Sequence, residues 1–340
     1  MKFPKWIDIE EVVIDGVKCR IYIPQPDKRN VNNKMCLFYI HSGGWCIMKA
    51  KYSDYYLAPF IRRLGCTIVS IDYSLAPENK FPAAINECEK VVLAFYNGLH
   101  QKYDIDKNKL VIMGESAGGN LSIASCLRLT NNNNSNIIKC QVLVYPVVNS
   151  FDLLNRSYQI YNKKHKNTGL LSPDDMARWI LLYLGLPATV QNVKLMLRNQ
   201  HISNKIRNNE EFKTYFNCDA LDDEEDEFET AEIESYEEND LARMIEPYLL
   251  NCEFAPVMAP LQKLSLLPPT LTITSNFDVL KTEGRLFHDK IKKAGIDATY
   301  KNYKNAIHGH LTVPFSRVAR SMRDDICNFI NCQLNNQNSQ

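Results

Sequence analysis

The sequence predicts an α/β fold with a mainly parallel central sheet, helices on both faces and a helical cap inserted into the chain. Short apolar runs alternate with helical patterns up to about residue 150, as expected for strands joined by crossover helices. The same alternation returns at about residue 270. Residues 151–255, in between, hold helical patterns and no clear strand. We therefore expect one domain over residues 1–340, with 151–255 as a cap above the C-terminal strand ends, where such folds place their sites.

The first half of the predicted sheet can be followed element by element. Its strands are apolar or alternating runs at residues 19–24, 35–40, 66–72, 109–114 and 141–148. The first of these alternates, and we expect it at an edge of the sheet. Helical patterns cover 53–64, 82–99 and a segment that begins at residue 115. Gly65 ends the first helix in the manner of a C-cap.

The second half contains the cap and the last strands. We expect a cap helix at 170–185, strands at 270–275 and 298–303, and helices at 281–294 and 316–333. Residues 219–240 are dense in Asp and Glu and poor in apolar residues. Their mutual repulsion predicts a disordered, solvated loop, with a docking or gating segment as the alternative.

Composition excludes several classes of protein. A formal net charge of +1 argues against a surface that follows phosphates, so no nucleic-acid partner is expected. The start of the chain lacks the apolar region of a signal peptide, and no run approaches the roughly 18 apolar residues of a membrane span. The 11 cysteines show neither CxxC pairs nor zinc-like spacing, which predicts reduced core thiols, no metal site and a cytoplasmic location.

The strongest chemical signal is Gly114-Glu115-Ser116-Ala117-Gly118, a G-x-S-x-G motif between a predicted strand and a predicted helix. A nucleophilic serine needs such a sharp turn so that its hydroxyl is exposed above the sheet. The helix that follows directs N–H groups at developing negative charge. A chance match at an ordinary turn is the alternative, and the position of the motif disfavours it.

A glycine pair follows directly after the predicted strand 35–40. In His41-Ser42-Gly43-Gly44-Trp45, backbone with little side chain can approach a ligand closely and offer bare N–H donors. We therefore predict an oxyanion hole formed by the N–H groups of Gly43, Gly44 and Ala117. We interpret His41 as a residue that braces the loop. Trp45 is expected to bind substrate as a wall of an acyl pocket, with plain core packing as an equal alternative.

A base for Ser116 is expected late in the chain, because enzymes with this serine turn order their triad as serine, acid and histidine. His308, followed by Gly309, lies in a loop after a predicted strand and is our candidate. His310 is the alternative in the same loop, and His288 is expected on a helix surface.

The acid candidate is Asp278, just beyond the strand 270–275. A carboxylate there can receive the Nδ1–H of the histidine and leave Nε2 free for the serine. Glu283 is the rival, but it falls inside the next helix, where an exposed charge near the helix start is the favoured interpretation.

Together these residues resemble the hormone-sensitive-lipase group of α/β-hydrolases, and most closely the arylacetamide deacetylase family. The resemblance runs from about residue 10 to 330. It depends on FYIHSGGWC (38–46), YSLAPENKFP (73–82), GESAGGN (114–120), APLQKLSLLPPT (259–270), FDVLKTEG (277–284) and IHGH (307–310).

The resemblance implies an α/β-hydrolase fold and a serine carboxylic-ester hydrolase with amide or acylglycerol turnover as further activities. Its substrates would be small-molecule or lipid esters, with no metal or organic cofactor. It assigns the triad to Ser116, Asp278 and His308. One departure is Ser42, which replaces the first glycine of the usual HGGG loop. The membrane anchor of that family is not in this sequence, so the alternative to a cytoplasmic enzyme is an endoplasmic-reticulum enzyme whose anchor is missing here. A non-catalytic binding or scaffold protein is the alternative function, since this fold also serves such roles.

Overall fold

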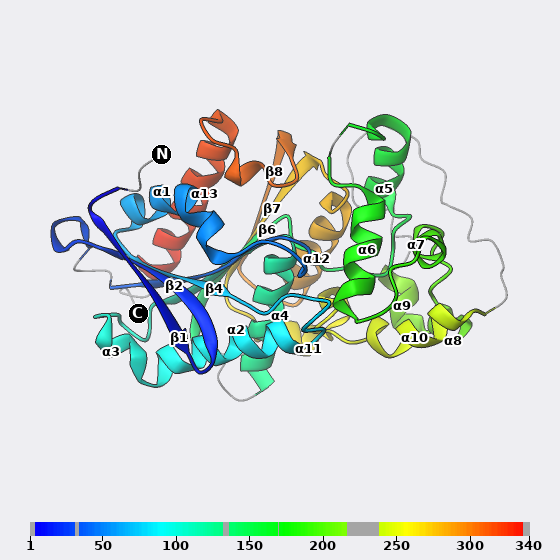
Figure 1. Cartoon of the computed structure of the whole chain (residues 1–340), viewed down its shortest axis with the longest axis horizontal. Coiled ribbons are helices and arrows are strands. Elements are labelled where there is room, and N and C mark those ends of the chain that lie inside the picture. Colours follow the sequence, from blue (N-terminus) through cyan, green and yellow to red (C-terminus); the bar gives the residue numbers. More distant parts are fainter. Residues whose placement is uncertain (1–3, 31–33, 132–135, 169, 216–237, 336–340) are drawn as a thin grey trace.

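An eight-stranded sheet forms the centre of the molecule in the computed structural model, which describes residues 4–30, 34–131, 136–168, 170–215 and 238–335. Its strand order is β1-β2-β4-β3-β5-β6-β7-β8 (Figure 1). The strands are β1 (Ile7–Ile14), β2 (Val17–Pro24), β3 (Cys36–Ile40), β4 (Thr67–Asp72), β5 (Leu110–Glu115), β6 (Ile138–Val144), β7 (Thr270–Phe277) and β8 (Ala298–Ile307). The six neighbouring strands β4, β3, β5, β6, β7 and β8 pair in parallel. This confirms the predicted mainly parallel sheet.

One prediction about the sheet is wrong. The strand expected at an edge over residues 19–24 is β2, and it lies between β1 and β4, antiparallel to both. The edge is β1, which pairs with β2 along its whole length. Asp15 and Gly16 form the turn between them with φ angles of 47° and 85°, the left-handed pair of a two-residue hairpin.

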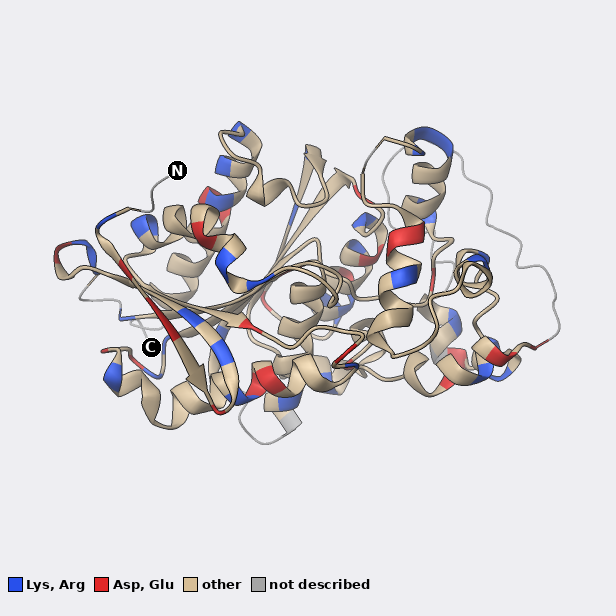
Figure 2. Cartoon of the chain, viewed as in Figure 1, with Lys and Arg blue, Asp and Glu red and all other residues tan. Residues whose placement is uncertain are grey.

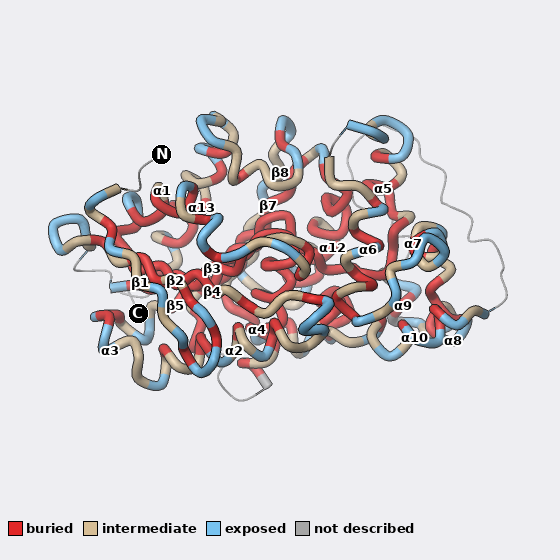
Figure 3. Tube along the Cα trace, viewed as in Figure 1, coloured by how far each residue is buried: buried red, intermediate tan, exposed pale blue. Residues whose placement is uncertain are grey.

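Helices cover both faces of the sheet, as predicted. On one face α1 (Asp54–Leu64) and α13 (Arg317–Asn335) pack with Phe60 and Ile326 against the strands. On the other lie α2 (Ala83–Ala94), α4 (Ala117–Asn131) and α12 (Lys281–Lys293), which share a second core with the sheet. Figure 3 shows the buried residues concentrated in the sheet and on the helix faces turned toward it. α3 (His100–Lys102) follows α2 after a short irregular helix.

The described part of the insertion between β6 and β7 contains helices joined by loops and no strand. Its helices are α5 (Arg156–Ile160), α6 (Pro173–Tyr183), α7 (Val190–Leu197), α8 (Asn204–Arg207), α9 (Glu210–Tyr215), α10 (Asp240–Leu249) and α11 (Leu261–Leu264). The start of α6 is a capping box, in which Ser172 and Asp175 bond each other's backbone. Residues 216–237, most of the acidic segment expected to be disordered, lie outside the described residues.

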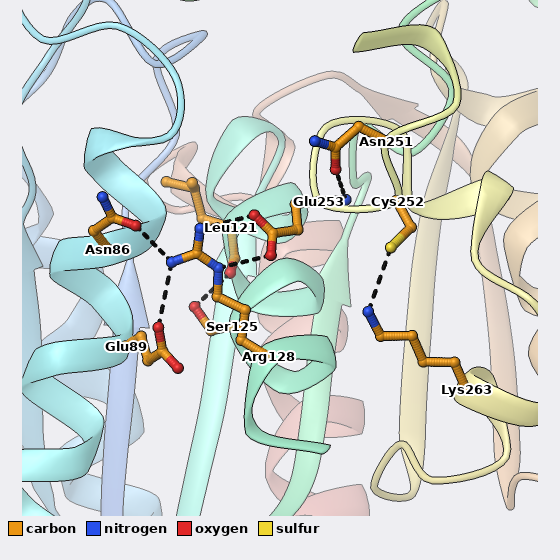
Figure 4. A network of polar contacts seen from close by, with 9 residues as sticks. All are labelled: Asn86, Glu89, Leu121, Ser125, Arg128, Asn251, Cys252, Glu253 and Lys263. Atoms are coloured by element: carbon orange, nitrogen blue, oxygen red, sulfur yellow. Dashed lines mark hydrogen bonds and ion pairs between the residues drawn. The ribbon is translucent and has the colours of Figure 1, made fainter. Parts of the chain in front are cut away.

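Arg128 connects its own helix, α4, to the end of the cap (Figure 4). Its guanidinium donates two hydrogen bonds to the Glu253 carboxylate, at 2.9 and 2.7 Å, in a bidentate pair. It also donates to Asn86 and Glu89 on α2, at 2.6 and 3.3 Å. One side chain therefore fixes the returning chain against two helices of the sheet domain.

Neither sign of charge dominates the surface formed by the described residues. Basic and acidic residues are interspersed over the helices and strands in the view of Figure 2. Within the described residues, all ten cysteines are free thiols. None of the described helices has the length and apolar character needed to cross a membrane.

Candidate active site

Ser116 occupies the turn between β5 and α4, as its motif predicts. Its φ of 56° lies in the left-handed region that residues with a side chain rarely adopt. Three backbone hydrogen bonds hold it there. Its N–H donates to the Val144 carbonyl at 2.9 Å, and its carbonyl accepts from the N–H groups of Asn120 and Val147 at 3.1 and 3.2 Å. The strained turn is therefore fixed by β6 and by the first turn of α4.

The two glycines of the motif are required by close backbone approach. A Cβ atom on Gly114 would lie 2.1 Å from the carbonyl oxygen of Gly118. One on Gly118 would lie 2.1 Å from the carbonyl oxygen of Ile40, at the end of β3. Neither neighbour is a movable side-chain tip, so any larger residue would push the nucleophile turn out of position.

Asp278 and His308 form a hydrogen-bonded pair. The loop after β7 carries Asp278 and the loop after β8 carries His308, and Nδ1 of the histidine lies 2.8 Å from Oδ2 of the aspartate. The second oxygen, Oδ1, accepts the N–H of Leu280 at 2.9 Å. The Asp278 carboxylate is fully buried, whereas 14% of the His308 side chain is exposed. With Nδ1–H donated to this carboxylate, Nε2 of the neutral imidazole is an acceptor.

The rival acid and bases lie elsewhere. Nε2 of His310 is 2.8 Å from the hydroxyl of Ser316 at the start of α13. His288 was expected on a helix surface and is instead buried, next to Tyr300. Glu283 was expected to be exposed and is also buried. Both expectations are wrong because the face of α12 that holds these residues packs against the sheet.

Glu283 has a structural role that its sequence position does not reveal. Its Oε1 accepts the N–H groups of Val148 and Asn149, at 2.7 and 3.2 Å. Burial raises its pKa well above the usual value. The side chain therefore supports the backbone that leaves β6 toward the cap.

Tyr145 connects the turn that carries Ser116 to His308. Its hydroxyl donates to Oε2 of Glu115, the residue before Ser116, at 2.5 Å. Its ring lies 4.7 Å from the imidazole of His308, centroid to centroid. One buried tyrosine thus contacts both Glu115, next to Ser116, and His308 of the His308–Asp278 pair. Neither Glu115 nor Tyr145 was singled out from the sequence, because their pairing joins β5 to the loop after β6.

The glycine loop after β3 is held in a tight turn. Gly43 and Gly44 have φ angles of 113° and 57°, and the Gly43 carbonyl accepts the N–H groups of Cys46 and Ile47, both at 3.0 Å. Across the described residues, no hydrogen bond donated by the N–H of Gly43 or Gly44 is found. Ala117 is the first residue of α4, where N–H groups have no partner within the helix. All three N–H groups are therefore suited to bind an external anion.

Trp179, on cap helix α6, packs directly on this loop, and sequence reasoning missed it. A Cβ atom on Gly44 would lie only 2.3 Å from Cδ2 of the Trp179 indole. The absence of a side chain at Gly44 therefore allows the tryptophan to rest against the backbone. A tryptophan on an amphipathic helix is a common core residue, so the sequence offers no signal that distinguishes this one.

Trp45 is fully buried and stacks on Tyr183 of α6, with ring centroids 4.4 Å apart and planes nearly parallel at 1°. Its carbonyl accepts the N–H of Ala76 at 2.9 Å. This geometry favours the core-packing alternative, and contact between Trp45 and a substrate stays a prediction.

His41 braces the loop as interpreted. Its ring is buried and stacks on Tyr73 at 4.2 Å, and its Nδ1 lies 2.8 Å from the Ser42 carbonyl oxygen. The Tyr73 hydroxyl donates to the carbonyl of His41 at 3.0 Å. Burial lowers the pKa of His41, so the ring is neutral at physiological pH.

A cavity of about 170 Å³ borders the acid on its cap side. It is lined by Asp278 and Phe277 from the end of β7 and by Tyr161 and His165 from the cap. Among the described residues, no group of three or more His, Cys, Asp and Glu side chains is arranged to hold a metal ion.

Comparison with known proteins identifies the family. A family model described as the alpha/beta hydrolase fold matches residues 37–207 and 215–312. The chain is 29% identical to arylacetamide deacetylase of Bos taurus over 335 residues, which cover 96% of this chain and 80% of that protein. It is also 29% identical to neutral cholesterol ester hydrolase 1 of Bos taurus, over 89% of this chain and 74% of that protein.

Solved structures show the same fold. A fungal esterase from Rhizomucor miehei superposes with a TM-score of 0.74 at 22% identity, covering 99% of this chain and 87% of that one. An esterase from Pyrobaculum calidifontis gives 0.70 at 24% identity, with coverages of 96% and 86%. The predicted α/β-hydrolase fold and the predicted resemblance are thus confirmed. The chain belongs to the α/β-hydrolase family and is similar within it to the arylacetamide deacetylases and neutral cholesterol ester hydrolases.

Proposed function

We propose that this chain is a serine carboxylic-ester hydrolase that forms an acyl-enzyme on Ser116. The observation that carries the proposal is the 2.8 Å hydrogen bond between His308 and Asp278, linked through Tyr145 to a strained serine turn. An imidazole oriented by a buried carboxylate and a serine at a helix N-terminus are the groups that acyl transfer needs.

In the proposed cycle Ser116 attacks the ester carbonyl carbon while Nε2 of His308 takes the hydroxyl proton. The electrons of the carbonyl π bond move to its oxygen, and the N–H groups of Gly43, Gly44 and Ala117 stabilise that oxyanion. His308 then protonates the leaving alcohol as the tetrahedral intermediate collapses. A water molecule repeats the sequence on the acyl-enzyme and releases the acid.

The substrate class proposed is a small-molecule or lipid ester, with arylacetamides as additional substrates. The names of the relatives, arylacetamide deacetylase and neutral cholesterol ester hydrolase, support esters and amides as substrates. The alternative of a non-catalytic binder is not favoured, because each proposed member of the triad is present in the chain. A cytoplasmic location stays a prediction.

The test compares intact protein with Ser116→Ala on p-nitrophenyl acetate, butyrate, octanoate and palmitate. We expect the variant to lose about 10⁴-fold or more in kcat, and the chain-length optimum of the intact protein to define the acyl preference. Ser125→Ala is the matched control, because Ser125 lies in the same helix and its hydroxyl donates to the Leu121 carbonyl. Folded intact protein that is as inert as Ser116→Ala on all four esters would refute the proposal.

The pH profile supplies a second, independent test. A protonated His308 cannot accept the serine proton, so kcat/KM should fall as the pH is lowered. A kcat/KM that does not fall on acidification, in protein that stays folded, would contradict the assignment of His308 as base.

A further inference from the structure

Glu115, directly before the proposed nucleophile, is a fully buried carboxylate. Within the described residues it has no lysine or arginine partner in any ion pair. Two tyrosine hydroxyls serve it instead: Tyr39 from β3 donates to Oε1 and Tyr145 donates to Oε2, each at 2.5 Å. Tyr39 also shares a 2.5 Å hydrogen bond with Tyr56 of α1. A buried acid costs several kcal/mol unless it is well bonded, so this site is stable only because the tyrosines converge on it.

The hydrogen bonds around Glu115 also fix the Tyr145 ring, which contacts His308. The Tyr145 N–H donates to the Ile273 carbonyl of β7 at 2.7 Å, and its hydroxyl is held by Glu115. Both ends of Tyr145 are therefore fixed, and its ring lies 4.7 Å from the imidazole of His308. Any movement of Glu115 would be transmitted to His308 through this ring.

Glu115 and His308 interact through charge as well as through packing. Burial, the largest effect, raises the pKa of Glu115 above its usual value, although hydrogen bonds from Tyr145 and Tyr39 and the proximity of His308 act to lower it. The effect of His308 is electrostatic, so it is mutual: an anion on Glu115 stabilises a cation on His308 as much as the reverse. In the proposed cycle the imidazole becomes positive when it takes the Ser116 proton. The attraction is therefore stronger in the transition state than in the ground state, which is the condition for catalysis.

We propose that Glu115 is a positioning residue for the ester hydrolysis, a second buried anion beside Asp278 that holds Tyr145 against His308 and stabilises the imidazolium. This inference depends on the proposed function of Ser116 and His308. Glu115 takes no proton in the cycle, since the Ser116 proton goes to His308 and from there to the leaving alcohol.

Four titratable side chains face Glu115 and His308. They are Tyr39 from β3, Tyr56 from α1, Tyr145 from the loop after β6 and Asp278 from the loop after β7. Burial raises the pKa of each of the three tyrosines well above its usual value. They therefore stay protonated, as hydrogen-bond donors, over the pH range in which the enzyme is assayed.

The test uses Glu115→Gln in the full chain, with p-nitrophenyl butyrate as substrate. We expect kcat to fall about tenfold or more with KM within about twofold, because the lost interaction forms only in the transition state. The acid limb of the kcat/KM profile should move to lower pH, since a neutral amide at this position no longer favours the imidazolium. Glu115→Asp keeps the charge and should recover part of kcat.

Tyr39→Phe separates this role from general support of the fold. It removes one hydrogen bond to Glu115 and leaves the Tyr145–His308 contact and the charge in place, so we expect less than about a threefold loss of kcat. Equal losses for Tyr39→Phe and Glu115→Gln, with an unmoved acid limb in both, would overturn the proposal. Parental kcat in Glu115→Gln would overturn it too.

The two proposals fail in different ways. If the intact protein hydrolyses no ester, the proposed function fails before Glu115 is tested. If the intact protein is active and Ser116→Ala is inert, only the role of Glu115 is in question. Should Glu115→Gln not fold, judged by its thermal melt, Tyr145→Phe tests the link in the same assay: a loss of kcat at constant KM supports it, and parental kcat overturns it.

Discussion

Replacing Gly44 by alanine should reduce both catalysis and stability. Gly44 has a φ of 57°, and an added Cβ would lie 2.3, 2.5 and 2.6 Å from Cδ2, Cε3 and Cγ of Trp179. Ordinary contact begins at 3.4 Å, so the loop or the indole must move by about 1 Å. The proposed oxyanion N–H of Gly44 is on the moving backbone.

The expected losses of stability and of kcat in Gly44→Ala have separate causes. An alanine in the left-handed region costs about 1–2 kcal/mol, and the smaller entropy of its unfolded chain returns about 0.4–1 kcal/mol. The clash with Trp179 adds about 1–3 kcal/mol, so the free energy of unfolding should fall by about 1–4 kcal/mol. Misplacing one oxyanion donor costs about 3–4 kcal/mol in the transition state. We therefore expect kcat for p-nitrophenyl butyrate to fall about 10²–10³-fold.

Gly295→Ala is the matched control, because Gly295 has a φ of 88° and no atom within 4 Å of an added Cβ. It carries the backbone strain without the clash, so its kcat should equal that of the parent. In a Trp179→Ala background the clash at Gly44 is absent, and Gly44→Ala should then cost much less kcat than it does alone. Parental kcat in Gly44→Ala, or an equal loss in both backgrounds, would refute the reasoning.

Three further predictions concern other parts of the molecule. Arg128→Ala leaves Glu253 unpaired in a site where their side chains are 16% and 22% exposed, and should lower the free energy of unfolding by about 2–4 kcal/mol in urea titrations. Arg243→Ala removes a pair whose side chains are 63% and 88% exposed, and should change the free energy of unfolding far less. Burial lowers the pKa of His201 to about 3, so the unfolded chain binds its proton first and stability should fall from about pH 6.5 to about pH 3; His201→Leu should flatten that part of the curve, and an unchanged slope would contradict it. Asp278→Asn should lower kcat about 10⁴-fold by favouring the wrong histidine tautomer, and a loss under tenfold would count against Asp278 as the acid.

Much of the sheet could be predicted because parallel strands are buried on both faces and therefore read as continuous apolar runs. β3 and β5 are buried at every position, and both were located from such runs. β1 was missed because it is exposed at the edge and its run IDIEEVVI is rich in acids. The Asp15-Gly16 pair was the available signal, since it is typical of a two-residue hairpin turn.

The candidate triad was predictable for a different reason. Ser116 lies within a local motif, and Asp278 and His308 each follow directly after a predicted strand, so the strand order itself brings their loops to one edge of the sheet. The surroundings of Glu283 and His288 were not predictable. Their side chains turn inward because α12 packs on the sheet, and the partners of Glu283 are backbone N–H groups 134 and 135 residues away.

The least predictable part of the site is the contact between the cap and the glycine loop, and it changes what the cap can be expected to do. Trp179 rests on Gly44 and Tyr183 stacks on Trp45, so a single helix, α6, supports two neighbouring residues of the loop that carries the proposed oxyanion donors. A cap that only enclosed the substrate would alter binding when it changed. Because α6 also fixes the loop, substitutions on its inner face should move donors that act in the transition state, and so change kcat as well as KM.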